Sequence, residues 1–189
     1  MTVRVILVSP DVGTPSREAG FDGDAEPDEA SLRRARLVAG ALPAAERQWC
    51  GPSRMCRATA GALGLRVRTE PALGDWDMGR WRGRRLDEVG AAEPEAVARW
   101  MAVPAAAPHG GESLLDLCDR AGAWLEGLTA ESGRVVAVAG PAVVRAVVVR
   151  ALGLPAEAFW RLDVVPLTAT ELSGRSGRWN LRCGSPLRV

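Results

Sequence analysis

The sequence predicts an α/β fold in which helices cover both faces of a mostly parallel central sheet. Two apolar runs are typical of buried strands. One is Val3 to Val8, and the other is RVVAVAG, which is bounded by Gly133 and Gly140. Apolar residues recur at helical spacing from Pro27 to Leu42 and again after Ser113. Strands that alternate with helices form sheets covered on both sides, so we expect a three-layer α/β/α sandwich.

The remaining elements are predicted from residues that cap helices or interrupt them. Asp28 is the expected N-cap of the first helix, and the helix that begins near Ser113 should end near Ser132 and Gly133. The polar segment RWRGRRLDEVGAAEPEAVARWM should hold short helices broken at Gly90 and Pro94. The expected order is completed by a helix from Ala142 to Leu152 and by a late hairpin of Ala169 to Leu172 with Trp179 to Arg182.

Composition indicates an ordinary globular protein and excludes several partners. The 189 residues are 47% hydrophobic, which suits a single domain over residues 1–189. A formal net charge of +1 gives no field that attracts nucleic acid or a membrane surface. Cys50 and Cys56 form a C-x5-C pair that matches no zinc spacing, so we expect no metal and no other cofactor. Without a signal peptide pattern or a run of ~18 to 20 apolar residues, we expect a cytoplasmic, reduced protein.

Several motifs follow one another along the chain. The first is the strand and polar turn from Val5 to Asp11, and the others are CGPSRMCRATA, LGDWDMGRWRG, PHGGES and VVAVAGPAVVRAVV. In this order they resemble the histidine phosphatase or phosphoglycerate mutase-like superfamily, which has its Arg-His-Gly turn at the first motif and the strand, turn and helix of its second histidine at the last. The resemblance covers most of the chain and implies a phosphoglycerate mutase-like fold.

The resemblance also implies a chemistry that these residues do not match. In that family a histidine accepts the phosphoryl group, while a second histidine and two arginines neutralise it and an acid protonates the leaving group. The matched positions hold Pro10 for the nucleophile, Ser9 and Met55 for the arginines, Asp75 for the acid and Gly140 for the second histidine. The chain contains one histidine, His109. We therefore expect a degenerate member without histidine phosphatase activity.

Three functions stay open. The favoured one is a protein that binds a small molecule or a protein partner in the former active-site crevice. The second is a repurposed enzyme for cyclisation, dehydration or isomerisation, and the third is a residual phosphatase or mutase. The proton carriers of the repurposed enzyme would be Asp11, Asp75, Glu112 and His109, and the residues expected to bind a ligand are Ser9, Arg54, Met55, Arg57, Trp76, Gly140 and Arg145.

Two residue types near the crevice have alternative roles. His109 is either a proton or ligand contact of the site or an exposed loop histidine. Trp76 and Trp100 either pack the protein or hold an apolar or cationic ligand. The expected partners are a small-molecule ligand and, through an apolar patch on the late hairpin, a second copy of the chain.

Overall fold

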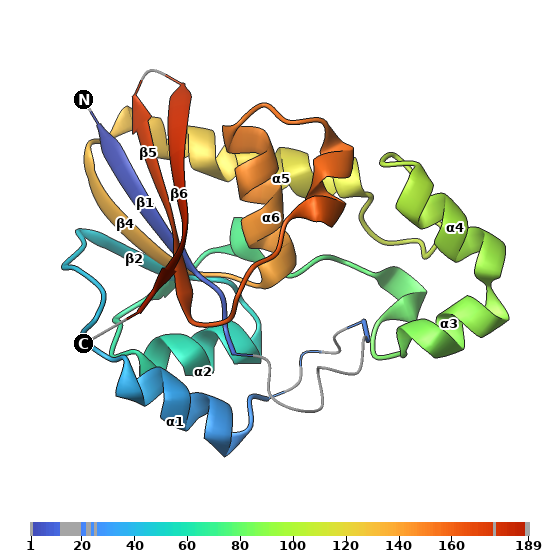
Figure 1. The fold of residues 1–189 in the computed structure, drawn as a ribbon, viewed down its shortest axis with the longest axis horizontal. Helices are drawn as coiled ribbons and strands as arrows, with labels where there is room; N and C mark the ends of the chain where they lie inside the picture. Colours follow the sequence, from blue (N-terminus) through green and yellow to red (C-terminus); the bar gives the residue numbers. More distant parts are fainter. Residues whose placement is uncertain (1, 12–19, 22–23, 25, 176, 188–189) are drawn as a thin grey trace.

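A six-stranded mixed sheet forms the centre of the protein, in a computed structural model that describes residues 2–11, 20–21, 24, 26–175 and 177–187 (Figure 1). The strands lie in the order β3-β2-β4-β1-β5-β6. The first four in this order are parallel to one another, while β5 and β6 pair antiparallel. The bounds are β1 Val3–Val8, β2 Arg47–Cys50, β3 Arg68–Thr69, β4 Gly133–Val138, β5 Thr168–Arg175 and β6 Arg178–Pro186.

Helices cover both faces of this sheet, which confirms the three-layer α/β/α prediction. One face packs against α1 (Glu29–Leu37) and α2 (Arg54–Ala62), and the other against α5 (Leu114–Gly127) and α6 (Pro141–Ala151). Strand β4 lies between two parallel neighbours, and its last four residues are buried, as expected for a central strand. Two further helices, α3 (Leu86–Ala92) and α4 (Pro94–Ala102), lie beyond the end of the sheet (Figure 1).

Most predicted elements are present, with some boundaries corrected. Helix α1 has Asp28 as its N-cap, which accepts from the backbone N–H of Ser31 at 2.6 Å, but it ends at Leu37 instead of Leu42. Gly90 lies inside α3 and does not break it, because a single glycine weakens a helix by only ~1 kcal/mol. Proline 94 does begin a helix, since its fixed φ suits the first helical turn.

Short 3-10 turns connect these elements around the sheet. They span Pro71–Leu73, Gly79–Trp81, Leu128–Ala130 and Ala156–Arg161. None of the helices in the described part of the chain is long and apolar enough to cross a membrane.

The larger apolar core lies between the sheet and helices α5 and α6. Leu117 of α5 is fully buried in this core, whereas Leu115, two residues earlier on the same helix, is 41% exposed. We expect Leu117→Ala to lower the free energy of unfolding by ~2–5 kcal/mol, because it removes methylene groups from a packed interior.

The matched control is Leu115→Ala, which removes the same atoms from an exposed position and should cost less than ~1 kcal/mol. Urea unfolding followed by circular dichroism measures both variants. Equal losses in the two variants would contradict the assigned core.

Candidate functional site

The carboxyl ends of the parallel strands β1, β2 and β4 meet at one edge of the sheet, where ligands of open α/β sheets bind. The register places Val8 opposite Val138 and Val138 opposite Cys50. Helices α2 and α6 begin directly after two of these strands, with Ser53 and Gly140 as their N-caps. This edge is the candidate site.

Ser9 and Asp11, which follow β1, lie at this edge but face different surroundings. The Ser9 side chain is buried, and its backbone carbonyl accepts from the Leu167 N–H at 3.0 Å. The Asp11 carboxylate forms a hydrogen-bonded ion pair with Arg34 of α1, which raises the pKa of that guanidinium. Asp11 therefore neutralises a cation of α1 and anchors the chain after β1 to that helix.

Asp75 occupies the space that a side chain at position 140 would need. A Cβ built on Gly140 would overlap with Asp75 Oδ1 and lie 3.4 Å from its Cγ, so a larger residue at position 140 would require the Asp75 carboxylate to move. Burial and, to a smaller extent, the charge of Asp75 raise the pKa of the nearby Cys56 thiol to about 12. Asp75 is thus the carboxylate that lies at the start of α6.

The residues of α2 present cations outward and an apolar side chain inward. Arg54 is exposed and forms ion pairs of 3.7 Å with Asp24 and 3.4 Å with Glu26. Arg57, one turn later, is also exposed and has no ion pair with the described residues. Met55 is 7% exposed. Of these residues, Arg57 has the guanidinium that is available to an anion.

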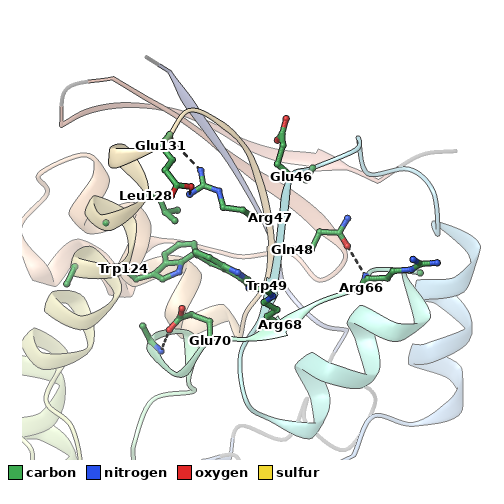
Figure 2. Close-up of a pocket in the computed structure, with 15 residues that line it drawn as sticks. Glu46, Arg47, Gln48, Trp49, Arg66, Arg68, Glu70, Trp124, Leu128 and Glu131 are labelled. Atoms are coloured by element: carbon green, nitrogen blue, oxygen red, sulfur yellow. Dashed lines mark hydrogen bonds and ion pairs between the residues drawn. The ribbon is translucent and has the colours of Figure 1, made fainter.

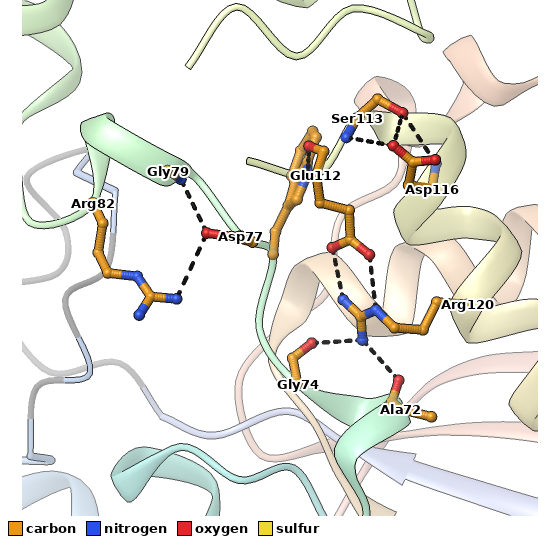
Figure 3. A network of polar contacts seen from close by, with 10 residues as sticks. Ala72, Gly74, Asp77, Gly79, Arg82, Glu112, Ser113, Asp116 and Arg120 are labelled. Carbon is orange, nitrogen blue, oxygen red and sulfur yellow. Dashed lines mark hydrogen bonds and ion pairs between the residues drawn. The ribbon is translucent and has the colours of Figure 1, made fainter. Parts of the chain in front are cut away.

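Glu112 belongs to a clamp that holds together two loops beside the site (Figure 3). Both of its carboxylate oxygens accept from Arg120 of α5 at 2.8 Å. The same guanidinium donates to the carbonyl oxygens of Ala72 at 2.8 Å and Gly74 at 3.0 Å. Arg120 therefore fixes the segment that leads directly into Asp75, and Glu112 acts through this guanidinium as a positioning residue.

His109 is buried, which overturns the alternative of an exposed loop histidine. Its Nδ1 accepts from the Gly111 N–H at 3.0 Å, its Nε2 has no partner among the described residues, and its ring lies 5.1 Å from that of Trp81. Burial lowers the pKa of the imidazole, while nearby Asp77 raises it and Arg80 lowers it. The imidazole is therefore neutral at neutral pH.

The His109 loop passes unusually close to the segment that contains Gly79. A Cβ on Gly79 would overlap with the His109 carbonyl oxygen, and Arg80 N–H donates to that oxygen at 3.0 Å. A Cβ on Gly111 would likewise overlap with the backbone carbonyl oxygen of Asp77. The glycines of PHGGES thus permit two loops to share backbone hydrogen bonds.

The aromatic residues near the site form one packed cluster. The Trp76 indole N–H donates to the Glu112 carbonyl at 2.7 Å, and its ring lies 5.3 Å from those of Trp100 and Phe159. The Arg145 guanidinium lies over Phe159 at 5.7 Å, and its buried Nε has no acceptor among the described residues. These contacts favour packing for Trp76 and Trp100. Sequence reasoning missed Arg120, because no local pattern links it to Glu112 eight residues earlier.

The fold and motifs define the class. The chain belongs to the histidine phosphatase superfamily, branch 1, whose family model matches residues 16–184. It is 34% identical over 154 residues to the glucosyl-3-phosphoglycerate phosphatase of Mycolicibacterium vanbaalenii. The aligned residues make up 72% of this chain and 68% of that protein.

Solved structures agree with this assignment. A mycobacterial glucosyl-3-phosphoglycerate phosphatase in complex with VO3 is 26% identical, with a TM-score of 0.83 over 97% of this chain and 98% of that one. The alpha-ribazole phosphatase from Shigella flexneri is 18% identical, with a TM-score of 0.83 over 98% of each chain, and shows the fold alone.

These relatives contradict the function expected from the sequence. The residues at the matched positions favoured a degenerate binding protein, with a repurposed acid–base enzyme as the alternative and in either case no phosphatase. The similarity to a named phosphatase over most of the chain overturns that expectation. Residue matching at single positions failed here because it weighed the nucleophile positions above the similarity of the whole chain.

The Arg120 clamp predicts a measurable loss of stability. We expect Arg120→Met to lower the free energy of unfolding by ~1–3 kcal/mol, because two carbonyls and a carboxylate lose a charged donor. The control is Arg36→Met, whose exposed ion pair with Glu29 should contribute less than ~1 kcal/mol. Urea unfolding of both variants measures this. A loss no larger for Arg120→Met than for Arg36→Met would refute the clamp.

His109 predicts a pH dependence of stability. The pKa of His109 is lower in the folded protein than in the unfolded chain. Below about pH 6.5 the unfolded chain therefore carries a proton on this imidazole more often than the folded protein does. The free energy of unfolding should therefore decrease as the pH falls from about 6.5 toward the folded pKa, and be flat with respect to His109 above that range. Urea unfolding between about pH 5.5 and 8 should show a smaller slope for His109→Gln. The same slope in both proteins would contradict the buried, neutral imidazole.

Proposed function

We propose that this chain hydrolyses a phosphate monoester of a small polar metabolite, with phosphorylated sugar acids as the first substrates to test. The single observation that carries the proposal is the 34% identity to a glucosyl-3-phosphoglycerate phosphatase. The position of the site supports it, because α2 and α6 both begin at the edge where β1 ends, and helix N-termini stabilise phosphoryl oxygens. Arg57 is the exposed guanidinium that would join them.

We further propose that this hydrolysis proceeds without a phosphohistidine. The family resemblance puts Pro10 and Gly140 at the two histidine positions, and neither side chain can accept a phosphoryl group. His109, the one histidine of the chain, is buried against Trp81. The finer description, a member without the family's catalytic histidines and arginines, belongs to this proposal.

In the proposed route, water is the nucleophile. Its oxygen attacks phosphorus as the ester P–O bond breaks, so that the phosphate monoester and one water give an alcohol and inorganic phosphate. One proton leaves the attacking water and one proton reaches the departing alkoxide. We assign both transfers to Asp75, the carboxylate beside Gly140, which delivers a proton to the departing alkoxide and takes up the proton that the attacking water loses.

The partners and the location stay predictions. The small-molecule partner would be the phosphate ester itself, and a homodimer through hairpin β5–β6 is a proposal on the same footing. We also propose a cytoplasmic location, which the free thiols of Cys50, Cys56 and Cys118 favour, because all three are buried and unpaired.

The test is phosphate release from glucosyl-3-phosphoglycerate, 3-phosphoglycerate and an aryl phosphate by the purified chain. We expect release above the buffer blank from at least one of them and a decrease of about 100-fold or more in Asp75→Asn, because a proton carrier contributes at least this much. Asp119→Asn, an exposed carboxylate on α5, should leave the rate unchanged.

Two outcomes would contradict separate parts of this proposal. If none of the three esters releases phosphate faster than the blank, the phosphatase proposal fails. If release occurs but acid-labile, base-stable label stays on the protein after quenching with 32P-labelled substrate, the phosphatase proposal holds and the direct attack by water is wrong.

A further inference from the structure

A row of hydrogen-bond donors crosses four strands on the sheet face that carries α1 and α2. Arg4 of β1 pairs in register with Arg134 of β4 on one side and with Ser173 of β5 on the other, and Ser173 pairs with Asn180 of β6. Residues paired across a sheet point to the same face. All four side chains therefore lie on one surface, at the start of β1 and away from the candidate active site.

This surface is hollowed into a pocket of about 620 Å³. Its floor is the donor row, and a second row contributes Glu171 and Arg182, which are cross-strand partners. The segment Ala41 to Pro43 forms a wall beside it. On this face the buried part of the second apolar cluster includes Ile6 and Val136 but not Arg4 and Arg134, which lie two residues earlier on the same strands.

The charges of this pocket are unbalanced. Among the described residues, its lining carries three guanidinium groups against one carboxylate, that of Glu171. Arg4 and Arg182 are exposed, and neither side chain has a hydrogen bond or an ion pair with the described residues. Arg134 donates to the Ala44 carbonyl at 2.9 Å, while Glu46 outside the pocket accepts from its backbone N–H at 2.6 Å. The unfilled hydrogen-bonding capacity is therefore on cationic donors.

This arrangement has a cost in the unliganded protein. Adjacent strands lie about 4.8 Å apart, so Arg4 and Arg134 place like charges on neighbouring positions of one face, which is destabilising. A bound anion would remove this repulsion. Guanidinium groups match the geometry of phosphoryl oxygens, and Ser173 and Asn180 offer neutral donors next to them.

We propose that this pocket is a second anion site, which binds a phosphoryl group of inorganic phosphate or of a phosphate monoester. It is separate from the candidate active site, because Arg4 and Ser9 are five positions apart along the β1 direction, roughly 16 Å at 3.3 Å per residue. It does not depend on the proposed hydrolysis, since none of its donors belongs to the residues assigned to that reaction.

The experiment titrates the purified chain with inorganic phosphate and, separately, with glycerol 3-phosphate, followed by calorimetry and by the Nε resonances of labelled arginines. Arg4 and Arg182 resonances should shift with both ligands. The double variant Arg4→Gln, Arg182→Gln should lose about tenfold or more in affinity for this site. Arg33→Gln, an exposed arginine of α1, is the matched control and should bind as the wild type does. A shift with only one ligand identifies the source, free phosphate or ester.

Thermal unfolding gives a readout that a merely structural role would not produce. Without phosphate, the double variant should melt at the same temperature as the wild type or higher, because the repulsion on Arg134 is removed. Phosphate should raise the melting temperature of the wild type and of Arg33→Gln by more than that of the double variant. The proposal is overturned if the Arg4 and Arg182 resonances do not move, or if the double variant binds phosphate with unchanged affinity.

Discussion

The parallel pairing of β1 with β4 is the constraint on which the rest of the structure depends. It runs from Val3 opposite Gly133 to Val8 opposite Val138, and the last residues of both strands are fully buried. Because the two strands end at the same level, the turn after β1 and the start of α6 lie at one edge. A shift of one residue would exchange the side chains that β1 gives to the two apolar clusters, so packing on both faces of the sheet fixes the register.

Arg120 connects the loops outside the sheet to helix α5. It lies on α5, which packs against α6, and its guanidinium holds Glu112 together with two carbonyls of the segment before Asp75. The loops that carry His109 and Gly79 are joined to each other by backbone hydrogen bonds. The position of Asp75 beside Gly140 is therefore set by a helix that has no other part in the site.

The two anion sites that we propose use different physics. At the carboxyl edge, helix N-termini supply fixed partial charges close to a carboxylate, Asp75, so that a phosphoryl group meets both attraction and a group for proton transfer. On the sheet face, Arg4, Arg134 and Arg182 supply full charges, and no residue of this pocket is assigned to proton transfer. The first arrangement suits chemistry, and the second suits binding alone.

The sequence by itself determined the elements and their order, because strand and helix periodicity are local properties. Val3–Val8 and the strand before Gly140 lie where the apolar runs predicted them, and Asp28 caps its helix. It did not predict the short strands β2 and β3, which have little apolar pattern of their own and are defined by their neighbours. Activity also could not be inferred from single matched positions, since a whole-chain relationship to phosphatases outweighed them.

Only the tertiary structure decided which side chains meet. It paired Asp11 with Arg34, buried His109, and joined Glu112 to Arg120. These contacts depend on side-chain directions and on elements far apart in the chain, which no local periodicity encodes. The sequence thus determined where chemistry-bearing residues enter the fold, and packing decided which of them are paired with one another.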